Sequence, residues 1–327
     1  MLEAARTRIM EVYDSLLAGA DPRIKGYPLM ESPVNMSAIL LAYLAFVLYI
    51  GPRFMANRKP YQLKEVMIVY NFSLVAVSIY IVYEFMMSGW ATTYTWRCDP
   101  VDYSDSPQGQ RMVQVAWLFL FSKFIELMDT VFFVLRKKHG QITFLHIFHH
   151  SIMPWSWWWG VSHAPGGMGS FHAMVNSFVH VIMYSYYGLS AAGPRFQKFL
   201  WWKKYMTAIQ LVQFVLVSIH ATQYYFMRSC GYQAPLILHL IWVYGTFFFV
   251  LFSNFWYQAY TKGKRLPKNN QELSGKNKGT SSNGTVANGA TKVANGSHKH
   301  LENGSAHKNG SAHHENGCTH SSKMKKA

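Results

Sequence analysis

Seven long apolar stretches constrain the fold of this 327-residue chain more than any other feature. They cover residues 34–50, 65–88, 112–135, 143–160, 170–190, 204–226 and 235–260. A helix needs about 20 apolar residues to cross a bilayer, where an unpaired backbone polar group is costly. We therefore expect an all-α integral membrane protein with seven transmembrane helices, and we assign residues 34–260 to one membrane domain.

Two segments of different composition flank this domain. Residues 1–33 are mixed in charge and contain three prolines, so we expect a short N-terminal lead-in. Residues 268–327 contain no aromatic residue and are dominated by Gly, Asn, Ser, Lys and His. Because such a composition cannot bury enough apolar surface to fold, residues 261–327 are predicted to form a disordered tail. That tail supplies +9 of the formal net charge of +16.

Lys and Arg gather in the loops on one side of the predicted bundle. Fifteen lie on this side: Arg53, Arg58, Lys59, Lys64, Arg136, Lys137, Lys138, Arg195, Lys198, Lys203, Lys204, Lys262, Lys264, Arg265 and Lys268. The other side holds seven: Arg6, Arg8, Arg23, Lys25, Arg97, Arg111 and Arg228. Basic loops face the cytosol, so we expect a lumenal N-terminus and a cytosolic tail. No basic stripe with interleaved aromatic residues occurs, so nucleic acid is not an expected partner.

The cysteines fit this orientation. Cys98 and Cys230 fall in the two lumenal loops that follow the second and sixth stretches, and Cys318 lies in the tail. The lumenal side of a secretory-pathway membrane is oxidising, so a disulfide between Cys98 and Cys230 is predicted. Two unpaired thiols remain the alternative.

Three histidines stand out inside the fourth apolar stretch. His146, His149 and His150 are three and four residues apart, which places them on one face of a helix. Polar groups in hydrocarbon are costly, so such a cluster indicates a functional site. Three interpretations are open: histidines packed between helices, a metal site, and nucleophilic or acid–base catalysis.

Further polar residues lie at similar depth in the neighbouring stretches. Lys123 and Glu126 are three residues apart and can pair, whereas Asp129 needs another partner, for which a histidine is the obvious choice. The fifth and sixth stretches add polar stripes in the cytosol-facing half: Asn176, His180 and Tyr187, then Lys203, Thr207 and Gln210. Four other histidines are expected nearer the lumen, as packing or interface residues: His163, His172, His220 and His239.

Four motifs now occur in a recognisable order. They are Lys123-Phe-Ile-Glu126-Leu-Met-Asp129-Thr130, the His146-to-His150 box, His180-Val-Ile-Met183-Tyr184-Ser-Tyr186-Tyr187, and Thr207-Ala-Ile-Gln210-Leu-Val-Gln213. In this order the chain resembles the very-long-chain fatty acid elongases, from about residue 20 to residue 268. One motif alone would be weak, but four in order are specific. The long tail is not a hallmark of that family.

The resemblance implies a multi-pass enzyme of the endoplasmic reticulum whose helices enclose an acyl-chain tunnel. Such an enzyme condenses a long or very-long-chain, saturated or monounsaturated acyl-CoA with malonyl-CoA. The products are 3-oxoacyl-CoA, CoA and carbon dioxide, and neither a metal nor another cofactor is expected. Expected partners are membrane lipid and the 3-oxoacyl-CoA reductase, dehydratase and enoyl reductase of the elongation cycle. A homo-oligomer is compatible with this interpretation.

The chemistry suggests roles for the histidines. No cysteine can reach the polar layer, so His149 is our candidate for a covalent nucleophile that forms an acyl-imidazole. His180 is expected to stabilise or protonate the species that forms on decarboxylation. Asp129 would orient a histidine of the box, as the third member of a triad does. His146 and His150 would complete the hydrogen-bonded surroundings.

The remaining candidates are expected to bind substrate. Four cationic residues near the cytosolic rim suit the CoA phosphates: Arg136, Lys138, Lys203 and Arg265. Four polar residues suit the pantetheine amides or the thioester: Gln141, Tyr186, Thr207 and Gln210. Five more belong to the same polar layer and are included in the substrate site: Lys123, Glu126, His146, Asn176 and Tyr187.

Two alternative functions explain less of the sequence. A membrane di-iron desaturase or hydroxylase also carries such a histidine box, but it needs several boxes to supply its ligands. A non-enzymatic lipid carrier or receptor does not explain ionisable groups stacked on three helices. The tail has one further feature, because Lys323 and Lys325 resemble a dilysine retrieval signal.

Overall fold

The computed structural model describes residues 2–262, and within this range it contains helices and no strand. The helices are α1 (Leu2–Ala18), α2 (Pro33–Ala45), α3 (Gly51–Met55), α4 (Lys64–Phe85), α5 (Pro107–Glu126), α6 (Met128–Leu135), α7 (Phe144–His163), α8 (Ser170–Ala192), α9 (Lys203–Phe226) and α10 (Pro235–Trp256). Short π-helical segments continue three of them, at Phe46–Ile50, Met86–Trp90 and Tyr257–Thr261. The predicted disordered tail, Arg265, Lys323 and Lys325 lie outside the described residues.

Side-chain caps explain where several helices begin. Ser32 accepts a hydrogen bond from the Val34 amide at the start of α2, and Ser106 accepts one from the Gly109 amide at the start of α5. Pro33 and Pro107 occupy the first helical position, where the missing N–H costs nothing. Each of these helices therefore starts where its sequence provides both a hydroxyl cap and a proline.

Four helical segments are long and apolar enough to cross a membrane: Pro33–Met55, Lys64–Trp90, Lys203–Phe226 and Pro235–Thr261. They match the first, second, sixth and seventh apolar stretches of the sequence. The prediction of an all-helical, multi-pass membrane protein is therefore confirmed in its coarse form. The other three stretches correspond to α5 with α6, to α7 and to α8, which carry the charged and imidazole groups of the predicted site. Seven spans thus remain a prediction.

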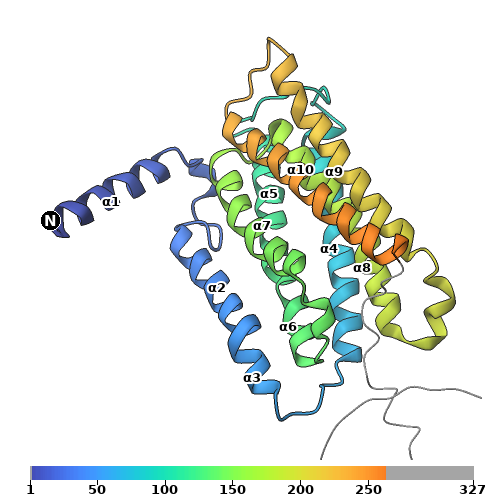
Figure 1. The fold of residues 1–327 in the computed structure, drawn as a ribbon. Helices are drawn as coiled ribbons and strands as arrows, with labels where there is room; N and C mark the ends of the chain where they lie inside the picture. Colours follow the sequence, from blue (N-terminus) through green and yellow to red (C-terminus); the bar gives the residue numbers. More distant parts are fainter. Residues whose placement is uncertain (1, 263–327) are drawn as a thin grey trace, which may run out of the picture. The chain divides into compact units, whose positions relative to one another are not determined.

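The long helices of residues 2–262 lie side by side, and α1 projects away from them (Figure 1). Helix α4 packs along α8, α9 packs along α10, and α5 packs against α7. The largest fully buried side chains include Trp90, Trp158, Tyr184, Phe85 and Phe119. Aromatic residues therefore fill much of the space between the helices. Helix α1 lies within residues 1–33, for which the sequence analysis names no helix.

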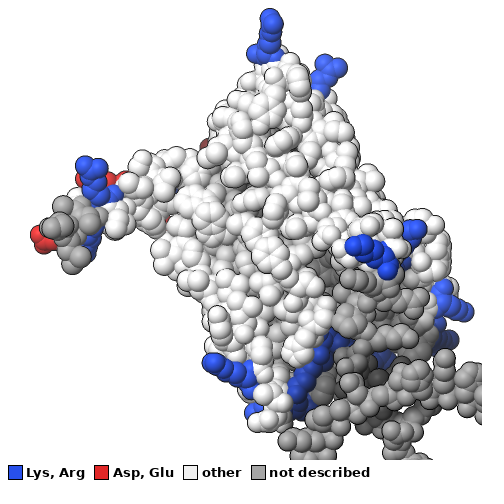
Figure 2. Space-filling model, in the orientation of Figure 1, with Lys and Arg blue, Asp and Glu red and all other residues white. Residues whose placement is uncertain are grey.

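The face of the bundle drawn in Figure 2 has a broad uncharged belt. Figure 2 shows white surface between blue Lys and Arg side chains at opposite ends of the molecule. Large apolar side chains within α4, α9 and α10 are exposed, among them Val69, Val212 and Val250. Such a surface would be unfavourable in water and suits hydrocarbon. The belt is thus what a membrane-spanning bundle requires.

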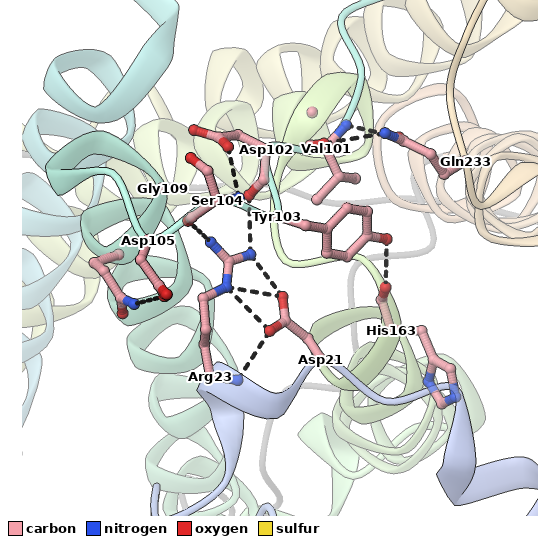
Figure 3. Close-up of polar contacts among 12 residues, drawn as sticks. Asp21, Arg23, Val101, Asp102, Tyr103, Ser104, Asp105, Gly109, His163 and Gln233 are labelled. Carbon is pink, nitrogen blue, oxygen red and sulfur yellow. Dashed lines mark hydrogen bonds and ion pairs between the residues drawn. The ribbon is translucent and has the colours of Figure 1, made fainter.

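One end of the bundle is held by a polar cluster around Arg23 (Figure 3). The Arg23 guanidinium donates hydrogen bonds to both carboxylate oxygens of Asp21, at 2.6–3.2 Å, which raises the pKa of Arg23. It also donates to the backbone carbonyls of Ser104 at 2.6 Å and Asp102 at 2.9 Å. We call Asp21, Arg23, Asp102 and Ser104 the Arg23 cluster, and the end that holds it the Arg23 end.

Three further contacts tie the loops of this end together. Tyr103 donates a hydrogen bond to the carbonyl of His163, the last residue of α7, at 2.8 Å. Val101 and Gln233 form two hydrogen bonds, at 2.8 and 3.1 Å. Cys98 and Cys230 form a disulfide with a Cα–Cα distance of 5.4 Å, across a sequence separation of 132 residues. This is the pairing that the sequence analysis predicts.

Candidate active site

A cavity of about 380 Å³ lies among α7, α8, α9 and α10. Twelve of the predicted site residues line it: Glu126, Gln141, His146, His149, His150, Asn176, His180, Tyr186, Tyr187, Lys203, Thr207 and Gln210. Apolar and aromatic side chains line the rest of the cavity, such as Trp157, Ile241 and Phe248. The cavity therefore has a polar part that carries the motif residues and an apolar part that can take a hydrocarbon chain.

Helix α7 supplies the three histidines of the box. Its start is fixed by Thr143, whose hydroxyl accepts a hydrogen bond from the His146 amide at 3.3 Å. The rings of His146 and His150 lie 4.3 Å apart, and those of His149 and His150 lie 5.2 Å apart, measured between centroids. Within the described residues, the rings of His149 and His150 form no hydrogen bond. These two imidazoles therefore face the cavity with free nitrogen atoms.

His146 is held by a chain of hydroxyl groups from two other helices. Thr130 Oγ1 on α6 lies 2.8 Å from His146 Nε2, and the Tyr43 hydroxyl on α2 lies 2.8 Å from Thr130 Oγ1. Tyr43 and Thr130 are both buried. A threonine hydroxyl can donate one hydrogen bond and accept others, so this chain fixes the orientation of the His146 ring with either tautomer.

Asp129 has a different partner from the histidine that the sequence analysis expects. Its carboxylate accepts a hydrogen bond from the hydroxyl of Tyr184 on α8, at 2.8 Å. The reason is a break in the third apolar stretch, because α5 ends at Glu126 and α6 begins at Met128. After this break Thr130, not Asp129, contacts the histidine box. Asp129 also lies outside the lining of the cavity.

Three buried polar side chains, those of Lys123, Glu126 and Asn176, form a cluster with His180 on α8. Lys123 Nζ lies 2.7 Å from Glu126 Oε1, 3.0 Å from Asn176 Oδ1 and 3.3 Å from His180 Nδ1. The same Nδ1 lies 3.1 Å from Glu126 Oε1. When Nδ1 carries the proton it donates to Glu126, which leaves Nε2 of His180 as a free acceptor. The predicted Lys123–Glu126 pair is therefore present, and it orients a histidine that lines the cavity.

The cationic residues predicted to bind CoA phosphates do not all lie at the cavity. Lys203 lines the cavity, whereas Arg136 and Lys138 do not. The Arg136 guanidinium points to the sulfur of Met67 on α4, at 2.9 Å. Of the cations predicted to bind CoA phosphates, only Lys203 is thus placed at the cavity within residues 2–262. Arg265 lies outside the described residues.

A metal site requires several ligand side chains that converge on one point. Between residues 2 and 262, no three His, Cys, Asp or Glu side chains are placed to hold one metal ion. The rings of His146 and His150 are close, but His146 Nε2 is engaged by Thr130. The geometry of the side chains therefore gives no support to the di-iron alternative.

Comparison with known proteins identifies the family. Residues 28–268 match the GNS1/SUR4 (ELO) family. The chain belongs to this family. It is 74% identical over 260 residues to very long chain fatty acid elongase 1 of Homo sapiens, and this match covers 80% of the chain and 93% of the relative. It is 58% identical over 262 residues to very long chain fatty acid elongase 7 of Rattus norvegicus, with the same coverage.

A more distant relative matches a longer part of this ELO family chain. Very long chain fatty acid elongase 4 of Homo sapiens is 41% identical over 292 residues, which is 89% of each sequence. The matches therefore include the whole region that carries the four motifs. They support the order of the motifs but do not assign a role to any single residue.

Some residues of the ELO-family site were missed in the sequence. His172 was expected to be a packing residue, yet it lines the cavity. It lies four residues before Asn176 and eight before His180, so its helical spacing could have placed it on the same face. Tyr43 gave no such signal, because it lies in a different apolar stretch and reaches the site only through Thr130.

Proposed function

We propose that this chain is the condensing enzyme of very-long-chain fatty acid elongation. Its family membership supports the reaction class, and the cavity supports the chemistry. The observation that carries the proposal is the position of His149, His150 and His180 on one cavity, whose lining also holds other polar motif residues and many apolar side chains. A substrate with an anionic head, a reactive thioester and a long hydrocarbon chain would find a cation, imidazoles and apolar walls in the same cavity.

We also propose how the chain lies in the membrane. All seven long helical segments would span the bilayer of the endoplasmic reticulum, with the tail in the cytosol and the Arg23 end facing the lumen. The excess of Lys and Arg in the loops of the opposite end supports this orientation. Acyl-CoA and malonyl-CoA would then enter from the cytosol, near Lys203 and Gln141. Lys323 and Lys325 would serve as a retrieval signal.

In the first step, His149 would act as the nucleophile. A free imidazole nitrogen attacks the carbonyl carbon of the acyl-CoA thioester, a C–N bond forms, and the C–S bond breaks. CoA leaves as the thiol with the proton that the imidazole gives up. The product is an acyl-imidazole on His149. The unpaired nitrogen atoms of His149 and the absence of a cysteine from the cavity lining support this assignment.

In the second step, malonyl-CoA would lose carbon dioxide inside the cavity. The electron pair of the broken C–C bond then attacks the acyl carbon, and the C–N bond to His149 breaks. The ring leaves as an imidazolide and takes up one proton from water, which restores the neutral imidazole and replaces the proton lost with CoA. In its doubly protonated form, His180 would donate through Nδ1 to Glu126 and through Nε2 to the thioester oxygen of the decarboxylated species, which would stabilise that oxygen. The apolar walls would exclude water and protect the acyl-imidazole from hydrolysis.

The other polar residues would position these groups. Tyr43 and Thr130 hold His146, and Tyr184 holds Asp129 beside the same layer. Gln141, Tyr186, Tyr187, Thr207 and Gln210 would contact the substrate head or its thioester, because they line the cavity. No metal or other cofactor enters the proposed reaction. Its product suits a ketoreductase as the next enzyme, so the remaining enzymes of the elongation cycle are proposed partners.

The test is condensation by the purified full chain without any other enzyme. Saturated and monounsaturated acyl-CoA substrates of increasing length are each incubated with malonyl-CoA labelled in its free carboxyl group. The proposal predicts release of labelled carbon dioxide and formation of a 3-oxoacyl-CoA two carbons longer, and neither should form when the acyl-CoA is omitted. Correctly folded protein that releases no carbon dioxide from any pair would overturn the proposal. Iron-dependent desaturation or hydroxylation of the chain would support the alternative.

A further inference from the structure

Helix α1 has an apolar face that the bundle leaves uncovered. The side chains of Ile9, Val12 and Leu16 are 67%, 59% and 51% exposed, and that of Met10 is 50% exposed. At 3.6 residues per turn, these positions flank Tyr13 and Leu17 along one side of the helix. Thr7, Arg8, Glu11, Asp14 and Ser15 occupy the opposite side. The helix is therefore amphipathic from Ile9 to Leu17.

The contacts of Tyr13 and Leu17 with the bundle fix the direction in which the apolar face of α1 points. The Tyr13 hydroxyl lies 2.9 Å from Ser32 Oγ, and Ser32 caps α2, which is a candidate membrane span. Leu17 packs on the core of the bundle. The side of α1 that carries Tyr13 and Leu17 therefore faces the point at which α2 enters the membrane. The acidic side, with Glu11 and Asp14, faces away from it.

Contacts at the C-terminal end of α1 fix the level of this helix along the bundle. The backbone carbonyl of Leu16 lies 2.9 Å from His163 Nε2, at the last residue of α7. Three residues after α1, the amide of Asp21 donates to the carbonyl of Ser162 at 2.7 Å. The end of α1 is thus tied to the end of a bundle helix, and its remaining turns project away from the bundle (Figure 1). This places the exposed apolar face at the level of a membrane surface.

We propose that α1 lies in the lipid interface at the Arg23 end, with the side that carries Ile9, Val12, Tyr13 and Leu16 in the acyl region. An amphipathic helix in this position buries its apolar face at the boundary between headgroups and chains. Arg6 lies on the same side of the helix as Tyr13 and Leu17, and its side chain is long enough to extend its charge to the headgroups. Helix α1 has two basic residues, Arg6 and Arg8, and three acidic ones, Glu3, Glu11 and Asp14. Because it carries no excess of positive charge, the lipid that it fits is a zwitterionic phospholipid rather than an anionic one.

The structure gives this contact a consequence for the site. Helix α7 carries the histidine box near one end and His163 at the other. A helix that is anchored in the interface and bound to His163 fixes the depth of α7 in the membrane. The contact of α1 with lipid is thus an anchor for the helix that carries the box. This inference rests on the contacts of α1 and is independent of the reaction proposed above.

The test uses the full chain in phosphatidylcholine vesicles, with one nitroxide label on each variant. Cys318→Ser removes the cysteine outside the disulfide, and Ile9→Cys or Glu11→Cys supplies the labelled position. Both positions are exposed, so neither label has to displace packed side chains. The label at position 9 should collide several-fold more with oxygen, which partitions into lipid, than with a water-soluble nickel chelate. The label at position 11, the matched control, should show the reverse.

Two results would overturn the proposal. Access of the nickel chelate to position 9 equal to that at position 11 would place α1 in water. Protection of position 9 from both reagents would show a protein contact, such as a second copy of this chain. A separate series with increasing phosphatidylglycerol tests the lipid class. The collision ratio at position 9 should stay constant, and a steady increase in its oxygen preference would contradict the choice of zwitterionic lipid.

Discussion

The Arg23 cluster and the histidine layer, which we define as Lys123, Glu126, His146, His149, His150, Asn176 and His180, both concentrate polar groups. They differ in how those groups are paired. In the Arg23 cluster the guanidinium binds a carboxylate and two backbone carbonyls. In the histidine layer His149 and His150 line a cavity without a hydrogen bond to any described residue. Paired polar groups stabilise a fold, whereas unpaired ones beside a cavity are available to a ligand.

The two regions also differ in the elements that build them. The Arg23 cluster joins loops that precede α2 and α5, and a disulfide and the Tyr103–His163 contact reinforce that end. The histidine layer comes from residues of the helices α5, α7 and α8 themselves. Groups on packed helices are held more rigidly than groups on loops. The comparison therefore predicts that changes in the first region alter stability and that changes in the second alter catalysis.

We expect His149→Ala to give the largest loss of catalysis with the smallest loss of stability. Loss of a covalent nucleophile should lower the condensation rate by about 10⁴-fold. Because the His149 ring has no hydrogen-bonding partner among the described residues, the melting temperature should change by only a few degrees at most. The measurements are initial rate and thermal unfolding on the same preparation. His239→Ala, on an exposed face of α10, is the control that should keep its activity.

Arg23→Ala should give the opposite result. Removing the guanidinium leaves Asp21, which is 3% exposed, without its counter-charge and leaves two carbonyls unpaired. The expected loss is about 3–5 kcal/mol in the free energy of unfolding, with the rate per folded molecule nearly unchanged. Lys25→Ala removes an exposed cation two residues away and should change stability by less than about 0.5 kcal/mol. A folded but inactive Arg23 variant would contradict the comparison.

Substitutions at Thr130 test whether a hydrogen-bonded hydroxyl outside the histidine layer contributes to catalysis by orienting His146. Thr130→Val keeps the shape but removes the hydroxyl that joins Tyr43 to His146, so the turnover number should fall about 10-fold to 100-fold. Thr130→Ser restores the hydroxyl and should recover most of the rate. Equal rates for the two variants would show that the hydroxyl chain has only a packing role.

The smallest effect is expected at the edge of the cavity. Lys203→Ala should raise the Michaelis constant for acyl-CoA a few-fold, and the difference from the unmodified protein should shrink at high salt, as for an exposed charge contact. Arg136→Ala is the matched comparison, because its guanidinium faces Met67 and not the cavity. It should leave the Michaelis constant unchanged. A larger effect for Arg136 than for Lys203 would contradict the position of the substrate head.

Local spacing was sufficient to predict much of the site. The box histidines share one cavity because they lie three and four residues apart on one helix, and the Lys123–Glu126 pair follows from the same periodicity. The charge of the loops and the positions of the cysteines predicted the pairing of Cys98 with Cys230. Each of these predictions used information within one helix or within the order of the loops.

The contacts that the sequence did not predict depend on a helix break or on distant segments. Helical periodicity through residues 112–135 assumes one helix, but α5 ends before Leu127 and α6 starts after it. The face of Asp129 therefore could not be assigned, and its pairing with Tyr184 was missed. Tyr43 is 87 residues from Thr130, and no spacing rule joins them. Helix α1 was not predicted, because the mixed charge of residues 1–33 and the three prolines that follow the helix were weighed without the apolar periodicity of residues 9–17.

The central claim is that His149 carries the acyl group between the two half-reactions. The direct measurement is release of CoA from an acyl-CoA by the purified protein when malonyl-CoA is omitted, followed by the mass of the protein. The account predicts up to one CoA released per active site and an increase in mass equal to one acyl group, located on the peptide that contains His149. Both should be absent from His149→Ala. If the active protein releases no CoA and gains no mass until malonyl-CoA is added, the acyl-imidazole mechanism is contradicted.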